Sequence, residues 1–261
     1  MHPILFEIGD FPIRAYGVMI TVAVLAGFLL AGKEAKRRGF EKERISDFAF
    51  YVVLGGILGA RIYYILFTDP KSFLANPLRF LAFWEGGLAI HGAILAGFLA
   101  SFWYTWKWKL PFWKWADTLA PSLILGQAIG RMACFLNGDA HGYPTDLPWG
   151  MVYAANSPAG QMFPGQALHP TQLYEMGFNL IIFFILWRLR KKNFFEGFLF
   201  LLYVILYSSI RIFVENFRAD QLTFGGGISA AQTAGFVAIG ISLAVFIFRM
   251  RRHGDVRPLN P

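Results

Sequence analysis

Cysteine and charged residues are scarce in this sequence. Its single cysteine, Cys134, excludes an internal disulfide and any metal cluster held by cysteines. Asp, Glu, Lys and Arg make up only 15% of the 261 residues, whereas 56% are hydrophobic and 18% are aromatic. This balance is far from that of a soluble domain. We therefore expect the lipid bilayer to be the main solvent of the chain.

The net charge of +8 is the one property that favours a nucleic-acid partner. However, the Lys and Arg residues occur in short clusters between long apolar runs, which is typical of loops that flank membrane spans. We therefore expect no nucleic-acid partner. The first apolar run, from Val18 to Ala31, is followed rather than preceded by basic residues, so we do not expect it to be a cleavable signal peptide.

A membrane span needs roughly 20 mostly apolar residues. The chain contains seven such stretches, at about 14–32, 48–67, 87–106, 116–136, 171–187, 197–216 and 229–248. The expected fold class is an all-α integral membrane protein that forms a single polytopic domain over residues 1–261. Segment 137–170 is rich in Gly, Pro and Asn and too polar to span, which predicts a small extramembrane head between the fourth and fifth helices.

Basic residues alternate between the loops, as the positive-inside rule requires. They are concentrated in 33–44, 107–114, 188–192 and the tail that begins at Arg249, whereas 132–187 contains no Lys or Arg. We therefore expect the N-terminus and the head to lie outside and the C-terminus to be cytoplasmic.

Ionisable residues inside spans are energetically costly, so each is a candidate for a functional site. With the expected topology, the polar residues of six spans lie in the outer half of the membrane: Tyr16, Arg61, His91, Arg131, Gln172, Tyr174, Glu175, Tyr207, Arg211 and Glu215. Scattered structural salt bridges would have no reason to share one depth. A polar cleft that opens toward the outer leaflet, in contrast, requires the side chains that line it to lie at one depth.

The residue types within this set indicate an anionic lipid headgroup. Arg131 and Arg211 come from different helices, and two guanidinium groups could clamp one phosphodiester. His91 is the only histidine inside a predicted span, and a neutral imidazole beside two arginines could act as a general base. The alternatives are a buried core histidine and an Arg211–Glu215 pair that only stabilises a helix end. The pattern indicates no metal site.

Several motifs occur in a defined order: Tyr16-Gly17, Gly59 to Arg61, Trp84 to Gly92 (WEGGLAIHG), Gly130-Arg131 through Asn137-Gly138, His169 to Glu175 (HPTQLYE) and Arg211 to Glu215. Together they resemble the phosphatidylglycerol–prolipoprotein diacylglyceryl transferases of bacterial inner membranes. The resemblance extends from the first predicted helix to the seventh.

The resemblance implies a seven-helix enzyme that transfers the diacylglyceryl group of phosphatidylglycerol to the lipobox cysteine of a prolipoprotein signal peptide. The reaction forms a thioether and releases glycerol phosphate without a cofactor. The resemblance also implies a multi-pass protein of the inner membrane with a periplasmic N-terminus, and we expect a monomer. It assigns catalytic roles to His91, Tyr207, Arg211 and Glu215, and substrate binding to Arg131, Tyr16, Asn137, Asp139 and Gly142.

Two residues depart from the family pattern. Cys134 replaces a usual asparagine, and Asp139 replaces a usual glutamate. We do not favour Cys134 as a nucleophile, because small buried cysteines are common in apolar helices.

The main alternative function is a transporter or channel for an anionic solute. Against it, the sequence shows neither an internal repeat nor helices broken near the midplane. A structural scaffold would not need a histidine and two arginines at one depth.

Overall fold

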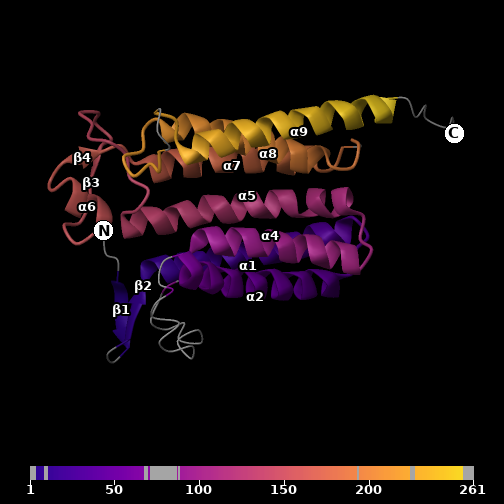
Figure 1. Cartoon of the computed structure of the whole chain (residues 1–261), viewed down its shortest axis with the longest axis horizontal. Helices are drawn as coiled ribbons and strands as arrows, with labels where there is room; N and C mark the ends of the chain where they lie inside the picture. The colour runs from indigo at the N-terminus through magenta and orange to yellow at the C-terminus, as the bar shows by residue number, and fades with distance from the viewer. Residues whose placement is uncertain are drawn as a thin grey trace. The chain divides into compact units, whose positions relative to one another are not determined.

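The computed structural model describes residues 4–8, 11–67, 70, 87, 89–192, 194–223 and 227–254 (Figure 1). The chain divides into two compact units, which are described separately. We call residues 1–31 and 116–261 the large unit, and residues 32–115 the small unit. The expectation of one polytopic domain over the whole chain stays a prediction.

Helices make up most of both units. In chain order they are α1 (Ala15–Arg37), α2 (Lys42–Phe67), α4 (Ile90–Lys107), α5 (Phe112–Asn137), α6 (Pro158–Met162), α7 (Thr171–Leu189), α8 (Phe198–Glu215) and α9 (Ala230–Gly254). Two antiparallel pairs of short strands also occur: β1 (Ile4–Ile8) with β2 (Phe11–Arg14), and β3 (Met151–Val152) with β4 (Ala167–Leu168). The sequence pattern did not predict these strands, because segments this short carry little periodic signal.

Within the described residues, five helices are long and apolar enough to cross a membrane: Ala15–Arg37, Glu43–Phe67, Phe112–Asn137, Phe198–Glu215 and Ala230–Arg252. This agrees with a multi-pass, helical membrane protein. Helices α4 and α7 coincide with the third and fifth predicted spans. The buried polar residues of α7 lie mainly in its first half, at Thr171, Gln172, Glu175 and Asn179, and they lower its hydropathy. The number of seven spans stays a prediction.

In the small unit, α2 packs closely against α4 at two glycines. A Cβ atom on Gly59 would lie 2.7 Å from the carbonyl oxygen of Gly92, so the two backbones can approach this closely only without side chains. Arg61 lies on the same helix, is buried, and donates a hydrogen bond to the carbonyl oxygen of Gly87 (3.2 Å). This contact ties Arg61 to the backbone of the segment that precedes α4.

In the large unit, α7, α8 and α9 lie side by side (Figure 1), and α5 packs against α7 and α8 through an apolar core. The buried residues of this core are Ala120 and Ile124 of α5, Ile182 and Leu186 of α7, and Leu199 and Tyr203 of α8. The core lies between the parts of these three helices that are distant from segment 138–170. The ends of the helices next to this segment carry polar residues.

Asp117 ties the start of α8 to α5. Its side chain is buried, and its two carboxylate oxygens accept hydrogen bonds from the backbone N–H groups of Gly197 and Phe200, each at 2.9 Å. The first N–H groups of a helix have no partner within the helix, and a carboxylate also interacts favourably with the helix dipole there. Asp117 thereby fixes the position of α8 along its axis relative to α5.

The segment between α5 and α7 is folded, and we call it the head; its position outside the membrane stays a prediction. Ser157 caps α6 by accepting a hydrogen bond from the N–H of Gly160 (3.1 Å). Tyr153, Ala159 and Leu168 form the core of the head. Tyr153 also donates a hydrogen bond to Oε1 of Gln172 in α7 (2.8 Å), and burial raises the pKa of Tyr153 to about 12. The Tyr153 hydroxyl therefore stays protonated and links the head to α7 at any physiological pH.

We expect Asp117→Ala to lower the free energy of unfolding by about 1–3 kcal/mol, because two buried N–H groups of α8 lose their acceptor. Denaturant unfolding in detergent would measure the change. Asp117→Asn keeps one acceptor and should cost less, and Asp146→Ala, at an exposed aspartate of the head, should be near neutral. Equal stability of Asp117→Ala and the wild type would contradict the capping role.

Candidate functional site

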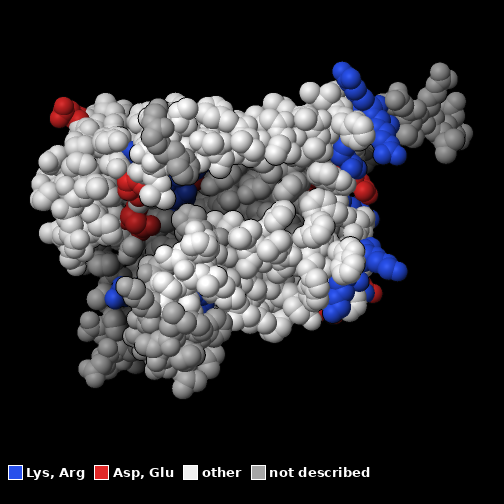
Figure 2. Space-filling view, in the orientation of Figure 1, with Lys and Arg blue, Asp and Glu red and all other residues white. Residues whose placement is uncertain are grey.

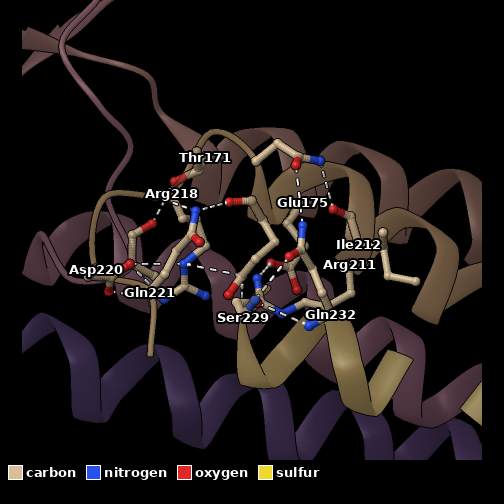
Figure 3. Close-up of polar contacts among 12 residues, drawn as sticks. Thr171, Glu175, Arg211, Ile212, Arg218, Asp220, Gln221, Ser229 and Gln232 are labelled. Atoms are coloured by element: carbon tan, nitrogen blue, oxygen red, sulfur yellow. Dashed lines mark hydrogen bonds and ion pairs between the residues drawn. The ribbon is translucent and has the colours of Figure 1, made fainter. Parts of the chain in front are cut away.

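Charged side chains gather in the large unit at the ends of the helices next to the head. They come from α5, α7, α8 and the segment that follows α8, and Figure 3 shows several of them pointing toward one another. We call this set the arginine cluster, and it consists of Arg131, Glu175, Tyr207, Arg211, Glu215, Arg218 and Asp220. The structure therefore brings together four of the predicted site residues: Arg131, Tyr207, Arg211 and Glu215.

Glu175 of α7 links the two arginines that belong to different helices. Only 2% of its surface is exposed. Its Oε1 accepts a hydrogen bond from Nη2 of Arg131 (2.6 Å) and from the hydroxyl of Tyr207 (3.4 Å). Its Oε2 lies 3.6 Å from Nη1 of Arg211. One buried carboxylate therefore holds side chains from α5 and α8 next to each other.

Two further carboxylates, those of Glu215 and Asp220, hold the other half of the cluster. Glu215 pairs with Nη2 of Arg211 at 2.8 Å, one turn earlier on α8, and lies 3.9 Å from Nε of Arg218. Arg218 in turn donates two hydrogen bonds to Asp220, at 2.9 and 3.0 Å. Oδ2 of Asp220 accepts a hydrogen bond from the backbone N–H of Ala140 in the head (3.1 Å). The cluster is thus continuous with the head.

The cluster balances its own charge, but one donor, Nη1 of Arg211, and one acceptor, Oε2 of Glu215, make no hydrogen bond within the described residues. Three arginines face three carboxylates within it. Nη1 of Arg211 makes no hydrogen bond to any residue that the structure describes, and its nearest carboxylate oxygen is 3.6 Å away. A buried guanidinium donor without an acceptor is energetically unfavourable. Such a donor, with two neighbouring arginines, is well suited to an anionic oxygen of a substrate.

Asn137 and Asp139 lie where α5 passes into the head. Asn137 is the last residue of α5, and its Nδ2 donates a hydrogen bond to Oδ1 of Asp139 (2.9 Å). The backbone carbonyl oxygen of Asp139 accepts a hydrogen bond from Nε2 of Gln172 (2.8 Å). The pair is therefore held against Gln172 at the start of α7, three residues before Glu175.

Gly142 lies at a point where three backbone segments meet. Its N–H donates to the carbonyl oxygen of His169 (3.0 Å), and it forms a β-bridge with Arg218. A Cβ atom at this position would lie 2.5 Å from Cβ of His169 and 2.7 Å from the carbonyl oxygen of Phe217. Only glycine fits, so Gly142 lets the head come close to both the start of α7 and the end of α8.

Tyr16 and Cys134 lie on the α1 and α5 side of the cluster. Tyr16 is the second residue of α1 and lies within electrostatic range of Arg131, Cys134 and Asp139. Cys134 is partly buried and interacts with the side chains of Arg131 and Asp139. The two residues that depart from the family pattern, Cys134 and Asp139, are therefore neighbours of each other and of Tyr16.

His91 belongs to the small unit, where it is the second residue of α4, and its side chain lies outside the described part. Its expected position beside Arg131 and Arg211 therefore stays a prediction. Within the described residues, no group of three or more His, Cys, Asp or Glu side chains could hold a metal ion.

The sequence-based prediction of site residues omitted Glu175, Arg218 and Asp220. Glu175 ends the HPTQLYE motif and was recognised as polar and buried, but its partners depend on how three helices meet. Arg218 lies eleven residues after Tyr207, a spacing that would place both on one face of a continuous helix. However, α8 ends at Glu215, so Arg218 reaches the cluster from the segment that follows the helix. Asp220 lies beyond the end of α8, and no pattern in the sequence indicated that it contacts Arg218.

Comparison with known proteins gives consistent matches. A family model described as prolipoprotein diacylglyceryl transferase matches residues 3–248. A phosphatidylglycerol–prolipoprotein diacylglyceryl transferase of Nostoc sp. is 40% identical over 248 residues, which cover 93% of this chain and 87% of the relative. A protein of the same name from Synechococcus elongatus is 38% identical over 258 residues, which cover 96% of this chain and 89% of the relative. One from Halalkalibacterium halodurans is 37% identical over 248 residues, which cover 94% of this chain and 86% of the relative.

We expect Gly142→Ala to destabilise the protein by about 1–3 kcal/mol, because its methyl group would overlap backbone atoms of two other segments. Gly177→Ala in α7 is the matched control. A Cβ atom there meets nothing within 4 Å, so alanine should be neutral or slightly stabilising. Thermal unfolding of the two variants in detergent would separate them, and equal midpoints would rule out the close approach at Gly142.

Proposed function

The chain belongs to the family of prolipoprotein diacylglyceryl transferases and transfers the diacylglyceryl group of phosphatidylglycerol to prolipoproteins, and we propose that the arginine cluster holds the phosphate of this lipid. The observation that carries the proposal is the unused Nη1 donor of Arg211, buried between arginines and carboxylates. Arg131, fixed by Glu175 on the neighbouring helix, is the second ligand of the phosphate. The relatives compared above all carry the name of the transferase, which favours this activity over the transporter considered from the sequence.

The reaction increases the negative charge on the phosphate, which favours a site of this kind. The sulfur of the lipobox cysteine bonds to the glycerol carbon that carries the phosphate, while the bond from that carbon to the phosphate oxygen breaks. The phosphodiester carries one negative charge, and the departing glycerol phosphate approaches two. Fixed guanidinium groups in a site shielded from water stabilise such developing charge strongly. Nothing is oxidised or reduced, so the exchange needs no redox cofactor.

The remaining site residues serve the thiol and the lipid headgroup. A cysteine thiol has a pKa of about 8.5 and is mostly protonated at neutral pH, so it needs a base to react as thiolate. We assign this base to His91. Tyr207 and Glu215 hold Arg131, Arg211 and Glu175 in place. Tyr16, Asn137, Asp139 and Gly142 shape the entrance of the site for the headgroup.

We also propose that α4 and α7 cross the inner membrane, which gives seven spans and a periplasmic head. Two features of the large unit support this orientation. Several of its Lys and Arg residues lie at the C-terminal end of α9, as Figure 2 shows, and the surface along the rest of α9 is uncharged in this view. Segment 132–187, which includes the head, contains no Lys or Arg. A cytoplasmic end rich in basic residues is the pattern of the positive-inside rule.

A transfer assay tests the phosphate site. The assay contains labelled phosphatidylglycerol in detergent micelles and a lipobox peptide, and the same peptide with serine in place of cysteine is the acceptor control. We expect label on the cysteine peptide alone. Arg131→Lys should lower the rate about 10²–10³-fold, because lysine keeps the charge but loses the fork that spans Glu175 and a phosphate oxygen.

Arg251→Ala is the matched control for the arginine variant, since this exposed arginine lies at the other end of α9. It should transfer at the wild-type rate. If Arg131→Lys transferred as fast as Arg251→Ala, the phosphate would have to bind elsewhere.

The base assigned to His91 makes a prediction about pH. We expect His91→Gln to slow transfer about 10²–10⁴-fold at pH 7, and this deficit should shrink as the pH rises toward 9. The reason is that the free thiol ionises by itself near its own pKa of about 8.5 and then no longer needs the base. Rates of the wild type and the variant across this range would measure the ratio. A deficit that stays constant with pH would assign His91 a binding or structural role instead.

A further inference from the structure

A second set of polar side chains lies one helical turn below the arginine cluster, on the side away from the head. It consists of Gln127 on α5, Asn179 on α7 and Tyr203 on α8, and we call it the amide layer. Each member lies four residues from a member of the cluster on the same helix: Arg131, Glu175 and Tyr207. Helices α5 and α8 run toward the head and α7 runs away from it, so all three steps lead in the same direction, by about 6 Å.

The amide layer separates charge from hydrocarbon. On the far side of it, the same three helices meet in the apolar core, through Ile124, Ile182 and Leu199 among others. On α7, the buried residues follow one stripe, which passes from Glu175 through Asn179 to Ile182. From the head inward, the polarity of this stripe therefore falls in steps, from a carboxylate to an amide to an alkyl group.

Asn179 is the unusual member of the layer. None of its surface is exposed, yet neither Nδ2 nor Oδ1 has a hydrogen-bond partner among the residues that the structure describes. Gln127 hydrogen bonds with Tyr203, although its Oε1 also has no partner within the described part. A buried amide without partners is costly, and native proteins seldom keep one unless something else satisfies it.

The substrate offers an acceptor at the matching depth. In phosphatidylglycerol, the carbon that bears the phosphate belongs to a glycerol whose other two carbons carry the acyl esters. With the phosphate on Arg131 and Arg211 and the chains directed toward hydrocarbon, these esters come to lie about one turn deeper than the cluster. The diacylglyceryl group has hydrogen-bond acceptors only, so it needs a donor from the protein. Within the amide layer, the donor without a partner among the described residues is Nδ2 of Asn179.

We propose that the side-chain amide of Asn179 donates a hydrogen bond to an ester carbonyl of the diacylglyceryl group and so makes the enzyme select ester-linked lipid. The proposal rests on the placement of the phosphate at the arginine cluster. Asn179 acts here on the part of the lipid that is transferred, whereas the cluster acts on the part that leaves.

Transfer from two phosphatidylglycerols of equal chain length tests the assignment, one with ester-linked and one with ether-linked chains. The ether lipid keeps the phosphate, the glycerol and the chains but lacks both carbonyl oxygens. We expect the wild type to use the ester lipid about tenfold better in kcat/KM, the value of one good hydrogen bond. Asn179→Leu, which has nearly the same volume, should lose this preference by slowing the ester lipid alone.

Three further variants make the result unambiguous. Ile182→Leu, one turn deeper on the same stripe, should keep the wild-type preference. Asn179→Ala removes the amide without filling its place and should lose the preference as Asn179→Leu does. Arg131→Lys should slow both lipids by the same factor. If Arg131→Lys slows transfer from neither lipid, the placement of the phosphate at the arginine cluster is wrong. The ester-to-ether ratio of the Asn179 variants still tests the role of the amide separately.

Two outcomes would overturn the proposal. A wild type that uses both lipids equally well would show that no group in the site recognises the carbonyls. An Asn179→Leu variant that slows both lipids equally would show that the amide serves the bundle, for example by holding an internal water molecule, rather than the substrate. Any difference in intrinsic reactivity between the two lipids cancels, because the wild type and the variant are compared on the same pair.

Discussion

The buried carboxylate of Glu175 is the interaction on which the site depends. Arg131 and Arg211 come from helices that pack mainly through an apolar core, and guanidinium groups cannot be buried there without an opposite charge. Glu175 supplies this charge to both at once, at 2.6 and 3.6 Å. It therefore allows two arginines to lie close enough to share a ligand. Its unequal distances also leave Arg211 the less satisfied of the two, with an Nη1 group that makes no hydrogen bond within the described residues.

The head and the cluster support each other through backbone contacts. Ala140 and His141 of the head contact the segment after α8, through hydrogen bonds to Asp220 and from Ala219. The absence of a side chain at Gly142 permits this approach. Because Arg218 is held by Asp220 and also lies beside Glu215, a shift of the head would reach Arg211 through only three ion pairs. The head is therefore part of the site's structure and not only a connection between α5 and α7.

The sequence alone predicted the helical membrane class and the family. It also predicted four members of the cluster, because the cost of charge in hydrocarbon makes Arg131 and Arg211 conspicuous in apolar runs. The spacing of four residues on one helix indicated the Arg211–Glu215 pair. The sequence could not indicate the partners of Glu175 and Asp220, since both carboxylates reach their arginines through tertiary packing. The short strands of the head depend on similar contacts between distant segments. The polar first half of α7, which lowers its hydropathy, is the same feature that supplies Gln172, Glu175 and Asn179 to the site.

The order of side chains along α5, α7 and α8 parallels the order of groups in a phospholipid. Charged groups come first, amide and hydroxyl groups follow one turn deeper, and alkyl groups fill the next turns. A charge-balanced cluster is suited to this substrate for a physical reason. Strong net positive charge would bind the phosphodiester tightly but would hold the more highly charged product still more tightly and delay its release. Carboxylates close to each arginine limit this effect, while the fixed guanidinium groups still act on the charge that develops as the bond to the phosphate breaks.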